Sequence, residues 1–203
     1  MADAMTEEDR VALVEAVREF ADAALTPFAA ERDAEKIFPI ETLRAAGELG
    51  LGGIYVGDDY GSGLSRRDAV AIFEELAKGD TAVAAYISIH NMVAWMIDAF
   101  GDEDQRAQWL PGLVSMEDLG SYCLTEPGAG SDAAAITTSA RLEGDEYVLN
   151  GTKQFISGAG SSAIYIVMAR TGGPDSGSNG MSAIVVPAGT PGLSFGPNEK
   201  KMG

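Results

Sequence analysis

The amino-acid sequence predicts an α+β protein in which an all-α domain, residues 1–119, precedes an antiparallel β domain, residues 120–203. The first observation is charge: residues 1–119 hold 24 acidic and 9 basic side chains, whereas the last 84 residues hold 7 and 5. The second is glycine, with 10 in the longer stretch and 15 in the shorter one. The third is a change from apolar residues at helical spacing to short apolar runs divided by Gly, Pro, Asn and Asp. Together these shifts predict two domains of different class.

Five helices are expected in the first domain, each from a cap and an apolar period. Thr6 suits an N-cap, and the acidic residues after it favour a helix N-terminus. Ser65 and Asp68 are three residues apart, as in a capping box. The expected helices begin after Thr6, run from Pro39 as the first helical residue to Gly50, from Ser65 to Gly79, over Thr81–Phe100 behind Asp80, and from Asp102 to Leu110 before Pro111.

The expected helix over residues 81–100 is apolar almost all the way round and is long enough to span a bilayer. It also carries His90, Asn91 and Asp98, each of which is costly in hydrocarbon. We therefore expect a buried helix at the centre of a bundle rather than a membrane span.

Short strands are expected in the second domain, because apolar and β-branched runs alternate there with turn residues. Residues 171–180, rich in glycine and serine, are typical of a flexible loop between two strands. The expected strands are Ser121–Leu124, Ile136–Leu142, Glu146–Leu149, Thr152–Ile156, Ala163–Ala169, Ser182–Val186 and Leu193–Phe195.

The composition disfavours several classes of function. The net charge is −17 at pH 7, which would repel a phosphate backbone or an anionic lipid surface, so neither nucleic acid nor a membrane is expected as a partner. Cys123 and His90 are the only cysteine and histidine, so an internal disulfide and a zinc site formed by these two alone are excluded. Residues 1–10 contain four acidic side chains and no apolar run, unlike a secretory signal or an arginine-rich transit peptide. An intracellular protein is expected.

One segment, Tyr122-Cys-Leu-Thr-Glu-Pro-Gly-Ala-Gly-Ser-Asp132, combines a strand, small residues and polar groups. Gly128, Ala129 and Gly130 would let a flat or phosphorylated ligand approach the backbone and would leave N–H groups free to donate. By pattern alone, a tight turn between strands fits equally well. The segment is not a P-loop, because it lacks Gly-Lys-Ser/Thr, and no helix pattern follows it as in a Rossmann fingerprint.

The part of this segment from Cys123 to Asp132 resembles the first signature of the acyl-CoA dehydrogenase family of flavoproteins. A second block, Asn150-Gly-Thr-Lys-Gln-Phe-Ile-Ser-Gly158, resembles the next flavin-contacting strand of that family. The likeness extends through Ala85-Tyr-Ile-Ser-Ile-His-Asn-Met92, Ser157-Gly-Ala-Gly160 and Gly189-Thr-Pro-Gly-Leu-Ser-Phe-Gly196, and is greatest to branched-chain members. The resemblance implies the family's N-terminal helical domain and part of its middle β domain, without the C-terminal four-helix domain.

The resemblance also implies a reaction. The expected activity is FAD-dependent α,β-dehydrogenation of a short branched-chain acyl-CoA, isobutyryl-CoA to methacrylyl-CoA in valine breakdown, with hydride passing to flavin N5. Electrons would then pass to an electron-transferring flavoprotein. The complete enzyme is expected to be a homotetramer, in a bacterial cytoplasm or, in a eukaryote, in the mitochondrial matrix.

Roles follow from the resemblance residue by residue. Phe155 stands where straight-chain relatives often have tryptophan, and it keeps an aromatic stacking surface. For Tyr86, a place in the acyl pocket and ordinary core packing are equal alternatives. The implied cofactor-binding residues are Tyr122, Leu124, Thr125, Gly130, Ser131, Phe155, Ile156 and Ser157, and the implied substrate-binding residues are Ser131 and Tyr86.

Other reactive side chains are expected to be structural. Glu126 and Asp132 are candidates for a general base, but the resemblance implies that these carboxylates cap and order their loop. His90 is expected as a core or pocket-lining residue, and Cys123 as a small buried hydrophobe.

No residue is assigned as the catalytic base, because the resemblance places the family's catalytic glutamate beyond Gly203. The 203 residues alone are therefore expected to be inactive. Two alternatives stay open: a non-catalytic fragment or interaction module, and a different short-chain acyl-CoA dehydrogenase or an acyl-CoA oxidase.

Overall fold

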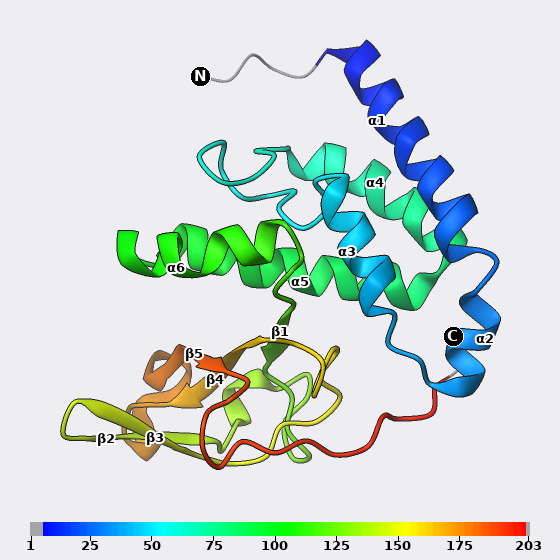
Figure 1. Ribbon diagram of the computed structural model, residues 1–203. Helices are drawn as coiled ribbons and strands as arrows, with labels where there is room; N and C mark the ends of the chain where they lie inside the picture. The colour runs from blue at the N-terminus through cyan, green and yellow to red at the C-terminus, as the bar shows by residue number, and fades with distance from the viewer. Residues whose placement is uncertain (1–5, 202–203) are drawn as a thin grey trace. The chain divides into compact units, whose positions relative to one another are not determined.

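The computed structural model describes residues 6–201, apart from the side chains of residues 174 and 175. The chain divides into two compact units, one of Met1–Leu119 with Gly196–Gly203 and one of Gly120–Phe195. The first unit is helical, whereas the second is built on a β-sheet (Figure 1). The expected α+β class is confirmed.

Capping residues mark the starts of four helices in the first unit. Thr6 with Asp9, Ser65 with Asp68, and Asp102 with Gln105 form complete capping boxes. Asp80 caps the longest helix by accepting hydrogen bonds from the backbone N–H groups of residues 82 and 83. The helices are α1 (Glu7–Phe20), α2 (Ala29–Glu35), α3 (Ile40–Glu48), α4 (Arg66–Gly79), α5 (Thr81–Phe100) and α6 (Glu103–Val114).

Helix α2 was not predicted, and two helix boundaries differ from expectation. Pro39 is the N-cap of α3 and not its first helical residue. The prediction that the last helix ends before Pro111 was wrong, because α6 continues through this proline to Val114. Leu110 and Leu113 are both 0% exposed, so burial of the last turn outweighs the hydrogen bond that proline cannot donate.

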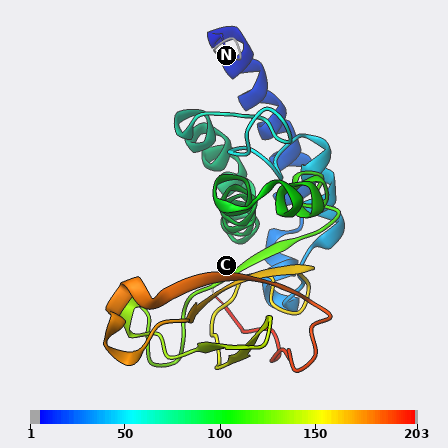
Figure 2. The same ribbon diagram turned by 90° about the vertical axis from the view of Figure 1, so that its left-hand side faces the viewer.

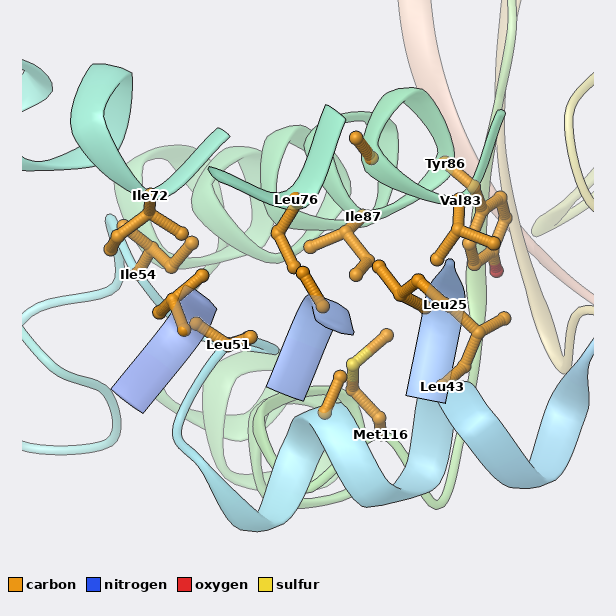
Figure 3. Packing of buried hydrophobic residues seen from close by; sticks show 14 of the residues in the cluster. Leu25, Leu43, Leu51, Ile54, Ile72, Leu76, Val83, Tyr86, Ile87 and Met116 are labelled. Atoms are coloured by element: carbon orange, nitrogen blue, oxygen red, sulfur yellow. The ribbon is translucent and has the colours of Figure 1, made fainter. Parts of the chain in front are cut away.

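The core of the helical unit is a layer of aliphatic side chains contributed by α3, α4, α5 and the chain around residues 51–54 (Figure 3). Leu76 of α4, Ile87 of α5 and Met116 converge there, and each is 0% exposed. Full burial of one such side chain stabilises the fold by about 1.5–3 kcal/mol.

Polar as well as apolar contacts hold helix α5 at the centre of this unit. Asn91 is 0% exposed, and its Oδ1 accepts from the Ile54 N–H at 2.7 Å. Its Nδ2 donates to the carbonyls of Leu51 at 2.7 Å and Ile87 at 3.0 Å. In the described part of the chain, α5 is the one helix whose length and composition would suffice for a membrane span, and half of its apolar window is buried inside the unit. This burial is that of a core helix.

Gly47 allows α3 to approach the turn at Ser115 closely. A Cβ atom at this position would lie 2.1 Å from the Ser115 carbonyl oxygen. Gly47→Ala is therefore expected to lower the free energy of unfolding by about 2 kcal/mol through overpacking, although alanine favours helices. Urea denaturation measures this, with the exposed neighbour Glu48→Ala as a control expected within about 0.5 kcal/mol of the wild type. Equal stability of the two variants would contradict the close approach.

The second unit contains one sheet, in which β4 is the central strand. It pairs antiparallel with β5, from Ile164 opposite Pro187 to Arg170 opposite Met181, and parallel with β1 on its other edge (Figure 2). The β2–β3 hairpin joins β4 through the parallel pair Ser139 and Arg170. The strands are β1 (Gly120–Cys123), β2 (Ser139–Glu143), β3 (Glu146–Asn150), β4 (Ile164–Arg170) and β5 (Met181–Pro187).

The sheet is mixed, whereas a purely antiparallel arrangement was expected. The chain between β1 and β4 is long enough to return to the same end of the sheet, as a parallel pair requires.

Residues 152–156 and 193–195 were expected as strands but form no ladder. Phe155 has φ +59°, which breaks an extended run. Residues 193–195 are held against the sheet by their side chains. The centroid of the Phe195 ring lies 5.1 Å from that of Tyr165, and Leu193 packs against the core of the sheet. The expected loop over residues 171–180 connects β4 to β5 and contains the 3₁₀ segment Pro174–Gly180.

Candidate cofactor site

Strand β1 leads directly into a loop rich in small residues, residues 124–131, of which Pro127, Gly128, Gly130 and Ser131 are exposed. A tight turn forms there, because Glu126 N–H donates to the Ala129 carbonyl at 2.9 Å and Ala129 N–H donates back at 3.1 Å. Beyond this turn, Gly130 is exposed, and a Cβ atom there would meet nothing within 4 Å. The backbone at Gly130 and Ser131 is therefore open to a ligand.

A second segment, residues 153–157, lies beside this loop. The Gln154 N–H donates to the Thr125 carbonyl at 2.8 Å, and the Ser121 hydroxyl donates to the Ser157 carbonyl at 2.6 Å. Ile156 packs against the core of the sheet, whereas the neighbouring Phe155 is 70% exposed. An exposed aromatic residue thus directly follows Gln154, the residue whose backbone is bonded to the small-residue loop.

Several hydrogen-bonding groups along these segments are available to a ligand. Within residues 6–201, the backbone N–H and the hydroxyl groups of Thr125, Ser131 and Ser157 make no hydrogen bond. Free N–H groups beside an exposed ring suit an anionic or polar aromatic ligand. Seven of the eight implied cofactor residues lie in the loop and the adjoining segment, namely Leu124, Thr125, Gly130, Ser131, Phe155, Ile156 and Ser157, whereas Tyr122 lies just before the loop in β1.

Glu126 belongs to this loop, but its side chain is buried and its carboxylate accepts several hydrogen bonds. Its carboxylate accepts from Thr137 N–H at 2.7 Å, the Thr137 hydroxyl at 2.8 Å, Thr138 N–H at 2.9 Å and Lys153 Nζ at 2.8 Å. Burial opposes its ionisation, but the hydrogen bonds from Lys153 and residues 137–138 outweigh burial and hold its pKa well below the usual range. A carboxylate whose pKa is held low and whose two oxygens already accept hydrogen bonds is poorly suited to act as a base. Its contacts fit a role in ordering the loop.

Cys123 and Tyr122 lie at the end of β1. Cys123 is buried, and desolvation raises the pKa of its thiol to about 12, so the thiol is unreactive at neutral pH. Tyr122 is half-buried, and desolvation raises the pKa of its phenol. No group of three or more His, Cys, Asp or Glu side chains suited to a metal ion occurs in the described part of the chain.

Tyr86 belongs to the helical unit. It is 4% exposed and its ring stands edge-on to Phe38, with centroids 4.7 Å apart. His90, one turn further along α5, is 0% exposed and its Nε2 lies 2.8 Å from the Leu113 carbonyl oxygen. Both side chains contribute to the packing of this unit.

Lys153 is the residue of this site that sequence reasoning missed. Its ammonium group donates to the Leu124 carbonyl at 2.9 Å and to Glu126 at 2.8 Å. A lysine within the expected strand Thr152–Ile156, two residues before its apolar end, was the available signal.

Comparisons with known proteins identify the family of the chain. The family model for the acyl-CoA dehydrogenase N-terminal domain matches residues 7–117, and the model for the acyl-CoA dehydrogenase middle domain matches residues 121–203. Mitochondrial isobutyryl-CoA dehydrogenase of Bos taurus is 56% identical over 185 residues, which cover 91% of this chain and 44% of the relative. The corresponding enzyme of Dictyostelium discoideum is 52% identical over 197 residues, covering 97% and 47%.

Among solved structures, butyryl-CoA dehydrogenase from Megasphaera elsdenii superposes with a TM-score of 0.89 at 35% identity, covering 100% of this chain and 54% of that one. The chain spans about half the length of the curated relatives it matches. Since the two family models together match almost all of its length, the chain belongs to the acyl-CoA dehydrogenase family.

Proposed function

We propose that these residues form the FAD-contacting part of an acyl-CoA dehydrogenase that acts on a short branched-chain acyl-CoA, with isobutyryl-CoA as the preferred substrate. The identities of 56% and 52% to isobutyryl-CoA dehydrogenases support this substrate class. The product would be methacrylyl-CoA, as in valine breakdown. The activity belongs to the whole protein, and no residue of this chain is proposed as the catalytic base.

One observation carries the proposal of FAD as cofactor: two adjoining segments present free N–H and hydroxyl donors beside an exposed ring. Thr125 and Ser157 would donate to the flavin ring, Gly130 and Ser131 would face the diphosphate, and Phe155 would stack on the flavin. When bound, FAD would accept the hydride that leaves the β-carbon. Donors fixed by the protein stabilise the charge that then develops on the flavin.

The partners follow from the same proposal. An electron-transferring flavoprotein would accept the electrons, and the complete enzyme would be a homotetramer. The relatives from Bos taurus and Dictyostelium discoideum are mitochondrial, which supports the mitochondrial matrix as the location in a eukaryote. In a bacterium the corresponding location would be the cytoplasm.

Phe155 provides a direct test of the stacking role. Phe155→Ala is expected to weaken FAD binding about tenfold, because loss of an aromatic stack costs about 1–1.5 kcal/mol. Flavin fluorescence quenching on titration with the purified protein measures the dissociation constant. Phe155→Trp, which keeps an aromatic face, should stay within about threefold of the wild type. FAD binding of wild-type strength by Phe155→Ala would refute the stacking role.

The substrate class is tested by anaerobic mixing of the full-length protein, loaded with FAD, with different acyl-CoA esters. Isobutyryl-CoA should bleach the flavin absorbance faster than butyryl-CoA or 2-methylbutyryl-CoA. Faster bleaching by butyryl-CoA would refute the branched-chain assignment. An unchanged spectrum with every ester would favour a non-catalytic flavin-binding module, and rapid oxygen consumption during turnover would favour an oxidase.

A further inference from the structure

A buried ion pair lies beneath the candidate cofactor site. The side chains of Lys153 and Glu126 are 10% and 4% exposed, and Nζ stands 2.8 Å from the Glu126 carboxylate. Lys153 Nζ also donates to the Leu124 carbonyl at 2.9 Å. The ammonium group therefore contacts the base of the small-residue loop at two points, one at each side of Thr125.

The pair connects parts of the chain that are far apart in sequence. Glu126 is fixed from one side by Thr137 and Thr138, and from the other side by Lys153. Lys153 immediately precedes Gln154, whose N–H donates to the Thr125 carbonyl. Three successive residues, 124–126, are thus bonded to two successive residues, 153–154. This double attachment sets the register between the loop and the segment that carries Phe155.

Stability alone does not explain such a pair. Removing two charges from water costs several kcal/mol, and the attraction between them regains this cost only with good geometry and further hydrogen bonds. Apolar side chains of similar volume often stabilise a core as well or better. Here the charges join backbone segments whose outward groups are the free donors of the site, which favours a role in geometry.

We propose that Lys153 is a positioning residue, which fixes the loop of residues 124–131 against the segment of residues 153–157 before the flavin binds. This inference rests on the proposed FAD site. Without Lys153, the Gln154–Thr125 bond is the one direct backbone tie that remains between these segments within residues 6–201. Ordering the segments then becomes a cost of binding, which weakens affinity for the cofactor.

The test compares FAD affinity with stability in the purified protein freed of flavin. Lys153→Met keeps an unbranched apolar stem but removes the ammonium group, and it is expected to raise the dissociation constant for FAD at least tenfold. Lys153→Arg, which keeps the charge and the donors, should stay within about fivefold of the wild type. Glu126→Gln keeps one acceptor oxygen, for Thr137 or for Thr138, and replaces the other by an NH2 group that cannot accept from Lys153. It should also weaken FAD binding, and it is the substitute variant if Lys153→Met does not fold.

Val186→Ala is the matched control, because it removes buried volume from the core of the same sheet. All titrations are performed well below each melting temperature. The control should melt at a lower temperature yet bind FAD within twofold of the wild type, and the visible circular dichroism of its bound flavin should be unchanged. Lys153→Met should alter that spectrum.

The outcomes separate this inference from the proposed function. Wild-type FAD affinity in Lys153→Met, or in Glu126→Gln when that variant replaces it, overturns the positioning role alone. Equal weakening by Val186→Ala also overturns it, because general destabilisation would then explain the loss. Failure of the wild-type protein to bind FAD overturns the proposed cofactor and this inference with it.

Discussion

Asn91→Leu is expected to lower the free energy of unfolding by about 4 kcal/mol, since it leaves the Ile54 N–H and the Leu51 carbonyl without their partner. Each buried polar group deprived of its hydrogen bond costs about 1–3 kcal/mol. The melting temperature should fall by about 10 °C for a chain of this size. Thermal and urea unfolding followed by circular dichroism at 222 nm measure both quantities.

Met92→Leu is the control for Asn91→Leu, because it changes the adjacent residue of α5 and conserves side-chain volume. It should change stability by less than about 1.5 kcal/mol. A loss below about 1 kcal/mol in Asn91→Leu would show that water replaces the amide, and that the loop at residues 51–54 is not held by this side chain.

The pH dependence of stability should carry the signature of His90. Burial lowers the pKa of this histidine to about 4, a change that the hydrogen bond to the Leu113 carbonyl opposes. Because the pKa in the folded protein lies below the unfolded value of about 6.5, neutral His90 contributes full stability above pH 6.5. That contribution is lost as the pH falls from 6.5 to 4, and amounts to about 3 kcal/mol.

Glu75 contributes to the pH dependence of stability at lower pH. Hydrogen bonds from Arg18 and Lys78 lower the pKa of Glu75 to about 2, so its stabilising contribution is lost below about pH 4.5. His90 is the one histidine of the sequence, and the interval from pH 6.5 to 4.5 lies between its unfolded and folded pKa values. Urea denaturation across this interval should show a slope that His90→Gln abolishes. An identical slope in His90→Gln would contradict the assignment.

The helix starts after Thr6 and Ser65 could be predicted from the sequence because their causes are local. Thr6 and Asp9, or Ser65 and Asp68, satisfy each other's backbone groups within four residues, and the structure shows both pairs as complete capping boxes. The central position of the helix over residues 81–100 was also predictable. Its polar residue Asn91 is costly in hydrocarbon, and its partners Leu51 and Ile54 lie within the same unit.

The failures at Pro111, at Phe155 and in the pairing of β1 have a different cause, since tertiary packing decided each of them. Pro111 ends a helix by local rules, but burial of Leu110 and Leu113 extends α6 past it. Phe155 lies in a strand-like run, yet it adopts a left-handed conformation beside the loop that follows β1. The parallel pairing of β1 with β4 depends on how the intervening chain returns, which the alternation of apolar residues does not reveal.

In the candidate site, too, local patterns could be predicted and long-range contacts could not. The small-residue loop was visible as a pattern, with a turn and a ligand-binding loop equally compatible, and the resemblance favoured the second. Lys153 escaped because its partners, Leu124 and Glu126, are 29 and 27 residues away in the sequence. A long-range ion pair has no local periodicity from which it could be predicted.

The most direct test of the cofactor site is amide hydrogen exchange of the purified protein with and without saturating FAD. Peptides covering residues 124–131 and 153–157 should exchange more slowly when FAD is present, because their free N–H groups would be hydrogen-bonded or covered. The tip of the β2–β3 hairpin, residues 143–146, should be unaffected. FAD protection confined to that hairpin, or absent from both segments at saturation, would contradict the placement of the flavin on this loop and its neighbour.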